Sequence, residues 1–138
     1  MRLTSIKKER GEEVASWEEI AEEVFAGRSG SREDRTIELC EAMIDIAAAL
    51  FNVPSKAIRE PGRSPLGVSR VRQVAMYVAH VVLRLNMSVI GKAFGRDRTT
   101  VLYACQLIED LRDDPDFDRI ITMTERVALA ALGNRVGL

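Results

Sequence analysis

The most regular feature of this chain is the recurrence of apolar residues at helical spacing. Apolar positions three and four residues apart predict a series of amphipathic helices, over residues 16–25, 32–51, 54–58, 69–85 and 116–132. A stretch rich in proline and glycine, from Glu60 to Val68, interrupts the series and predicts a loop. The pattern therefore predicts an all-α fold without a sheet.

Between Ser88 and Leu111 the pattern predicts two helices joined by a tight glycine turn. Ser88 is expected to cap the first helix, Gly95 to end it in the left-handed conformation, and Asp97 to cap the second helix. One face of the second helix is apolar and consists of Val101, Ala104, Cys105, Ile108 and Leu111. The opposite face carries Thr99, Leu102, Tyr103 and Gln106, with Arg98 at its leading edge. This arrangement predicts a helix-turn-helix whose second helix lies in the major groove of DNA.

Charge is distributed unevenly, although the formal net charge is only −1. Residues 59–105 carry eight Lys and Arg against two acidic residues, Glu60 and Asp97. Residues 1–58 carry eight against twelve, and residues 106–138 carry four against seven. A basic centre between acidic ends indicates a local DNA-binding face, which the net charge conceals.

The length of 138 residues suits one small domain with a single core. We expect residues 1–31 to form an extension with one short helix and residues 32–138 to form the helix-turn-helix domain. The first residues lack the apolar segment of a signal peptide, and no apolar run reaches the ~18 residues of a membrane span. Cys40 and Cys105 lie in apolar surroundings and are expected to be reduced core residues. These features predict a cytoplasmic, nucleoid-associated protein without a membrane partner.

Several motifs in this order resemble the C-terminal DNA-binding domain of the bacterial replication initiator DnaA. They are Arg-x-Arg-Gln-x-Ala-Met at 70–76, Ile-Gly-x-Ala-Phe-Gly at 90–95 and Arg-Asp-x-Thr-Thr-Val-Leu at 96–102. The resemblance covers roughly Ile44 to Val127. It implies an all-helical fold with a Trp-repressor-like arrangement, and binding to an asymmetric double-stranded DnaA box.

The resemblance also implies particular DNA contacts. Recognition-helix contacts are expected from Asp97, Arg98, Thr99, Thr100 and Leu102. Arg72 and Gln73 are expected to hold phosphates, and the loop before them, with Arg63, to enter the adjacent minor groove. Four neighbours in the same motifs complete the predicted DNA-binding set, namely Arg70, Lys92, Arg96 and Tyr103.

The chain departs from the family pattern at three places. The family motif usually has two glycines before Arg-Asp and a histidine after them, whereas this chain has one glycine and Arg98. The family loop is rich in Lys and Arg, whereas this loop has the single cation Arg63. No G-x-x-x-x-G-K-[ST] phosphate loop occurs, so we expect no nucleotide, no cofactor and no complete initiator.

Most of these residues also have a purely structural interpretation. Asp97 can act as a helix cap or accept a hydrogen bond from cytosine N4. Leu102 is either one scattered surface residue or a contact for a thymine methyl group. A cation such as Arg72 at a helix N-terminus opposes the helix dipole, a cost that a bound phosphate would offset. Arg63 is either a solvated loop residue or a minor-groove probe.

Three classes of function remain open at this point. We favour double-stranded DNA binding in replication control or transcription, with replication or transcription proteins as further partners. The alternative is a protein-interaction module that uses the acidic helices before Ile44 and an exposed Trp17, with the helix-turn-helix as scaffold. An enzyme is disfavoured because no nucleophile, base or metal cluster can be assembled, and the single histidine, His80, lies in a valine-rich helix. We therefore predict neither catalysis nor a bound metal.

Overall fold

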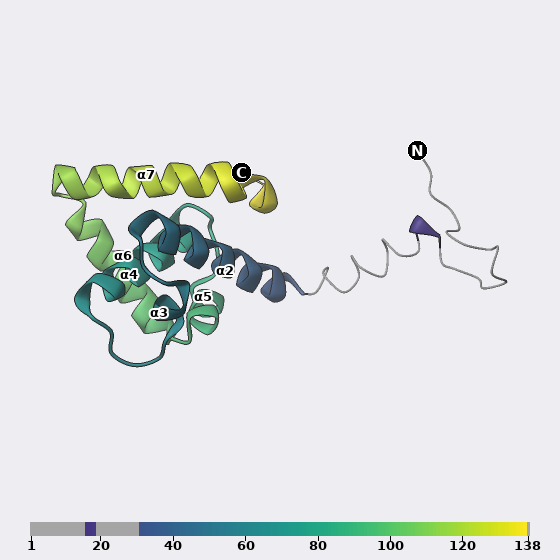
Figure 1. The fold of residues 1–138 in the computed structure, drawn as a ribbon, viewed down its shortest axis with the longest axis horizontal. Helices are drawn as coiled ribbons and strands as arrows, with labels where there is room; N and C mark the ends of the chain where they lie inside the picture. The colour runs from purple at the N-terminus through teal and green to yellow at the C-terminus, as the bar shows by residue number, and fades with distance from the viewer. Residues whose placement is uncertain (1–15, 19–30, 138) are drawn as a thin grey trace. The chain divides into compact units, whose positions relative to one another are not determined.

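The computed structural model describes residues 16–18 and 31–137 of the chain (Figure 1). Within them the helices are α2 (Arg32–Phe51), α3 (Ser55–Arg59), α4 (Leu66–Val81), α5 (Met87–Phe94), α6 (Arg98–Leu111) and α7 (Pro115–Leu132), followed by the 3-10 turn η2 (Gly133–Val136). None of the described residues belongs to a strand. The predicted all-α fold is confirmed.

The chain divides into two compact units, Met1–Arg35 and Thr36–Leu138. In the first unit Trp17 and Glu18 are helical, and Trp17 is exposed. Most of the helix predicted over 16–25 lies outside the described residues. Before α2 the Asp34 N–H donates to Ser31 Oγ, and the Ser31 N–H donates to Asp34 Oδ2, both at 3.1 Å. This reciprocal capping box satisfies two otherwise unpaired donors and fixes where α2 begins.

In the second unit α4 is the central helix, since it packs against α3, α5, α6 and α7. Its buried residues follow one another almost without a gap, namely Val71, Arg72, Val74, Ala75, Met76, Tyr77, Val78 and Ala79. Such all-round burial is expected of a helix surrounded by others. In Figure 1, α7 lies along one side of the unit, while α3 and α5 lie towards the other.

The start of α4 differs from the predicted one. The helix begins at Leu66 behind Pro65, and the Ser69 N–H already donates to the Pro65 carbonyl at 3.0 Å. The predicted cap at Ser69 is therefore wrong, and the loop is shorter than predicted because residues 66–68 are helical. Proline suits this place because it has no N–H and its φ, here −53°, lies near the helical value.

The ends of the other helices correct smaller predictions. Pro54 is the residue before α3 and not its first residue. Asp114 caps α7 by accepting from the Asp116 N–H at 3.0 Å, with Pro115 at the first helical position.

Within the described residues no helix is long and apolar enough to cross a membrane, and no cluster of His, Cys, Asp and Glu could hold a metal ion.

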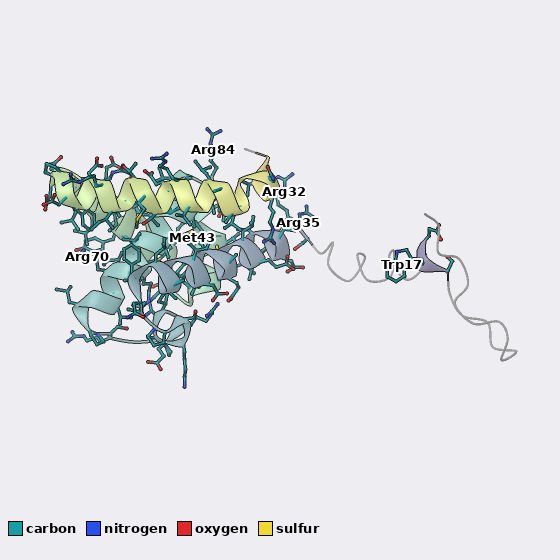
Figure 2. The ribbon with its side chains drawn as sticks, turned by 45° about the horizontal axis from the view of Figure 1, so that its top comes forward. Trp17, Arg32, Arg35, Met43, Arg70 and Arg84 are labelled. Carbon is teal, nitrogen blue, oxygen red and sulfur yellow. The ribbon has the colours of Figure 1, made fainter. Side chains whose placement is uncertain are left out.

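The buried residues of α2 recur at helical spacing and consist of Leu39, Cys40, Met43, Ile44, Ala47 and Ala48. Met43 is fully buried and points into the interior (Figure 2). Both cysteines are buried free thiols, as predicted. Burial raises the pKa of Cys40 to about 12 and that of Cys105 to about 11, so both thiols stay protonated and unreactive at neutral pH.

Arg112, directly after α6, joins three helices. Its Nε donates to Asp118 Oδ1 at 2.5 Å, and its Nη1 lies 3.1 Å from both Glu125 Oε1 and the Tyr77 hydroxyl. The Tyr77 hydroxyl donates in turn to Glu109 Oε2 at 2.6 Å. Burial and this carboxylate raise the pKa of Tyr77 to about 12. Because α4, α6 and α7 each supply a member, the network fixes the direction of α6.

Candidate nucleic-acid interface

The first helix of the motif, α5, ends as predicted but begins differently. Asn86, not Ser88, is its cap, since Asn86 Oδ1 accepts from the N–H groups of Ser88 at 2.8 Å and Val89 at 3.3 Å. At the other end Gly95 adopts the predicted left-handed conformation, with φ 65° and ψ 36°. The Gly95 N–H donates to the Lys92 carbonyl and the Arg96 N–H donates to the Gly91 carbonyl. These two bonds form a Schellman motif, which turns the chain sharply towards α6.

Gly91 allows α5 and the turn to approach each other closely. A Cβ atom at this position would lie 2.6 Å from the Arg96 carbonyl oxygen and 3.4 Å from the Arg98 nitrogen. The nearer distance is shorter than real Cβ contacts, and its partner is backbone that cannot rotate away. The angle between α5 and α6 therefore depends on the absence of a side chain at this position.

The second helix, α6, has the two faces that the sequence predicts. Its buried residues are Val101, Ala104, Cys105 and Ile108, which pack in the core formed with α4 and α5. Leu111, the last residue of the predicted apolar face, is half-buried. The exposed residues of its first three turns are Arg98, Thr99, Thr100, Leu102, Tyr103 and Gln106. Tyr103 is 60% exposed, an unusual amount for an aromatic side chain.

Asp97 occupies the predicted cap position before α6, with an extended backbone at φ −72° and ψ 155°. Its carboxylate, however, makes no capping hydrogen bond and is exposed. The position is as predicted, whereas the side-chain cap is absent. An exposed carboxylate at the start of a recognition helix is able to accept a hydrogen bond from outside the chain.

The loop between α3 and α4 lies beside the start of α6 because Arg96 joins the two. Arg96 Nη2 donates to the Glu60 carbonyl at 3.0 Å and to the Gly62 carbonyl at 3.3 Å. Arg63, at the exposed part of this loop, has no hydrogen bond or ion pair to any described residue. The predicted minor-groove residue and the recognition helix thus belong to neighbouring segments.

Arg72 does not lie where a phosphate ligand is expected. It is only 5% exposed, and its guanidinium donates to the Ile58 carbonyl at 2.8 Å, the Ala57 carbonyl at 3.2 Å and Ser64 Oγ at 2.8 Å. Burial, followed by the nearby charge of Arg96, lowers the pKa of Arg72. The buried side chain thus uses its donors on the protein itself.

Arg70 and Gln73 lie on α4 beyond its first turn, since the helix begins at Leu66. Arg72 is therefore not at a helix N-terminus, and the prediction that a bound phosphate offsets an unfavourable position in the helix dipole is wrong for it. Arg70 Nη1 donates to Gln73 Oε1 at 2.9 Å, and both side chains are half-exposed. In Figure 2 Arg70 lies towards the left of the unit. Lys92 lies on the exposed side of α5.

Two features of this region were not anticipated. Leu66, at the start of α4, is 74% exposed, more than any other large apolar residue described. The only indication of this exposure in the sequence was the position of Leu66 between Pro65 and Gly67, and this stretch was predicted to be a loop. The contacts of Arg72 and Arg96 had no signal in the sequence, because their partners, apart from Ser64 Oγ, are backbone carbonyls at least 14 residues away along the chain.

Comparison with known proteins places these features in a family. A family model described as the bacterial DnaA protein helix-turn-helix matches residues 40–108. The chain is 31% identical over 104 residues to the chromosomal replication initiator protein DnaA of Lachnoclostridium phytofermentans, an alignment that covers 74% of this chain. The same alignment covers 22% of that relative, so the chain spans about a fifth of its length.

A solved structure gives the same result for the fold. It is described as the crystal structure of a DNA replication initiation factor, and it superposes with a TM-score of 0.65 at 24% identity. The superposition covers 72% of this chain and 31% of the other. Since the family model takes in half of the chain and both helices of the motif, the chain belongs to the bacterial DnaA helix-turn-helix family.

Proposed function

We propose that this chain binds double-stranded DNA sequence-specifically, with α6 in the major groove, and acts in the control of replication initiation or transcription. The observation that carries the proposal is the exposed row on α6, from Arg98 to Gln106, opposite an apolar face fixed in the core. Membership of the DnaA helix-turn-helix family supports it. Residues 32–138 form the DNA-binding domain in this proposal, and residues 1–31 an extension.

The start of α6 provides the chemistry for base recognition. Arg98 is exposed and offers a fixed fork of donors, which suits O6 and N7 of guanine. Asp97, whose carboxylate makes no capping hydrogen bond, suits the amino group of cytosine. Leu102, one turn further on, suits the methyl group of thymine. Three neighbouring chemistries of this kind allow the helix to discriminate between base pairs.

The remaining exposed polar residues are suited to the sugar-phosphate backbone. Thr99, Thr100 and Tyr103 present hydroxyl groups along α6. On the neighbouring helices we assign Lys92, Arg70 and Gln73 to phosphates, and on the loop Arg63 to the minor groove. Contacts of this type fix the register of a protein on the duplex but carry little sequence information.

The salt dependence of duplex affinity tests this proposal. Each phosphate neutralised by Lys or Arg contributes about −0.9 to the slope of log K against log salt, so a few contacts give a slope of roughly −3 to −6. Fluorescence anisotropy with labelled duplexes over a range of salt concentrations measures it. A flat response, or binding to single strands only, would contradict the proposal.

A matched substitution identifies the surface responsible. Lys92→Ala should make the slope shallower by about one and weaken binding to all sequences alike. Arg126 is a suitable control because it is an exposed cation on α7, which packs on α4 and carries none of the proposed contacts. Arg126→Ala should leave the affinity and the slope unchanged. Equal losses in the two variants would show that binding depends on total charge and not on this face.

A further inference from the structure

The loop between α3 and α4 is held by two arginines that come from different segments. Arg72 reaches it from α4 and bonds to the end of α3 and to Ser64. Arg96 reaches it from the turn before α6 and bonds to the carbonyls of Glu60 and Gly62. Arg72 thus holds the residues just before the loop and the end of the loop, whereas Arg96 holds its beginning.

The partners of Arg72 explain why an arginine is buried at this position. α3 has only five residues, so its last carbonyls have no partner within the helix. The Glu60 N–H donates to the Lys56 carbonyl, whereas the next two carbonyls, of Ala57 and Ile58, accept from Arg72. A buried carbonyl without a donor is costly, and a guanidinium is able to serve several acceptors at once. Lysine, with one compact ammonium group, cannot reproduce this set of bonds.

The two guanidinium groups lie close enough for the charge of Arg96 to lower the pKa of Arg72. Two like charges beside each other are unfavourable unless acceptors surround them. Here five acceptors do so, of which four are main-chain carbonyls. The pair therefore fixes mainly the course of the backbone, because four of the five bonds go to main-chain carbonyls and one, to Ser64 Oγ, depends on a loop side chain.

We propose that Arg72 and Arg96 form a loop clamp, which contributes to DNA binding by positioning residues 60–65 beside the start of α6 and not by contacting phosphate. Arg72 is 5% exposed and uses its donors within the protein, and Arg96, which is half-buried, directs its Nη2 to two loop carbonyls. The clamp makes the loop and the recognition helix one rigid surface, so that both meet the duplex in a fixed relation. This inference rests on the proposed function and adds a positioning role to it.

An arginine-to-lysine change separates this role from phosphate binding. Lysine binds phosphate as a point charge, so Arg72→Lys keeps the affinity of a phosphate ligand but breaks a clamp. We expect Arg72→Lys and Arg96→Ala each to weaken duplex binding roughly tenfold, the scale of one lost charge-assisted hydrogen bond. Arg126→Lys on α7 is the matched control and should leave the affinity unchanged.

Amide hydrogen exchange of the full chain without DNA gives the second measurement. In Arg96→Ala and Arg72→Lys, exchange should increase at Ala57, Ile58 and Glu60, whose N–H groups donate to backbone carbonyls just before the loop and at its first residue. Exchange should stay unchanged in α6, which excludes general unfolding. Arg96→Ala disturbs the folded core less than Arg72→Lys, because the side chain of Arg96 is less buried than that of Arg72.

The two measurements overturn the inference in distinct ways. Wild-type affinity in Arg72→Lys and Arg96→Ala, or an unchanged exchange rate at Ala57, Ile58 and Glu60, would refute the clamp while the proposed function stands. A wild-type chain that binds no duplex would refute the proposed function itself, and the role of the clamp in DNA binding with it. Loss of affinity together with faster exchange in α6 would also count against the clamp, because the effect would then be global.

Discussion

The recognition helix α6 and the loop before α4 lie beside each other but are held in place by different forces. α6 is fixed by apolar side chains on its inner face, among them Val101 and Ile108, which are fully buried. The loop is fixed by arginine side chains, since Arg96 donates to the Glu60 and Gly62 carbonyls and Arg72 donates to the Ser64 hydroxyl. Apolar packing tolerates changes on the outer face, whereas a hydrogen-bonded loop depends on the exact donor.

The largest effect should come from the inner face of α6. Ile108→Ala removes buried methyl groups and leaves a cavity, so it should lower the free energy of unfolding by about 2–5 kcal/mol. Leu102→Ala, on the outer face of the same helix, should change it by less than about 0.5 kcal/mol. Urea denaturation followed by circular dichroism measures both. Similar costs for the two variants would mean that the faces are not divided as described.

The turn between α5 and α6 should respond next. Gly91→Ala places a Cβ atom against the Arg96 carbonyl, so it should lower the free energy of unfolding by about 1–3 kcal/mol. Gly67→Ala is the control, because Gly67 lies in α4 with nothing within 4 Å of its Cβ position. It should stabilise the chain by about 0.4–1 kcal/mol. Opposite signs in thermal or urea unfolding would confirm the close approach at Gly91, and a neutral Gly91→Ala would contradict it.

Features of the molecule that depend on neighbouring residues alone could be predicted from the sequence. The two faces of α6 were predicted correctly because they follow from local periodicity, which needs no knowledge of distant residues. The left-handed turn at Gly95 was predicted for the same reason. The caps were less certain, since Asn86 and Ser88 are equally good cap residues two positions apart. The first turn of α4 was missed because Gly67 is a poor helix former.

The role of Arg72 could not be predicted from the sequence. Its motif and its position in a basic segment both indicated a phosphate ligand, as did the supposed helix start at Ser69. Its actual partners lie 8 to 15 residues before it along the chain, and two of the three are backbone carbonyls. Since every residue type has a carbonyl, such partners leave no trace in the composition. The contribution of the candidate DNA-binding residues to affinity stays a prediction.

A smaller effect, confined to specificity, should come from Arg98. If its guanidinium contacts guanine, Arg98→Ala should lose about 1–3 kcal/mol of discrimination at one base pair and keep its preference elsewhere. Selection of sites from a random duplex pool, for the wild type and for Arg98→Ala, measures this. Arg98→His, which restores the residue usual in the family, should shift the preferred base at the same position. A uniform loss of affinity across all sequences would instead make Arg98 a phosphate ligand.

The smallest effect on stability should come from Arg59, which pairs with carboxylates, whereas Arg72 bonds mainly to backbone carbonyls. Its guanidinium lies 2.6 Å from Glu41 and 3.4 Å from Asp45, with about a third of the side chain exposed. Exposed ion pairs contribute about 0–1 kcal/mol, so Arg59→Ala should lower stability within that range and leave duplex affinity unchanged. Raising the salt concentration should remove most of the difference. A tenfold loss of duplex affinity would place Arg59 in the interface and contradict the account.

The most direct test of the central claim is a titration of the isotopically labelled chain with a selected duplex, followed by backbone amide chemical shifts. The largest shifts should fall on Asp97 to Gln106 and on residues 60–65, with small shifts along the outer face of α7. Shifts concentrated on α7, or on α6 without the loop, would contradict the account of one surface formed by the recognition helix and the clamped loop.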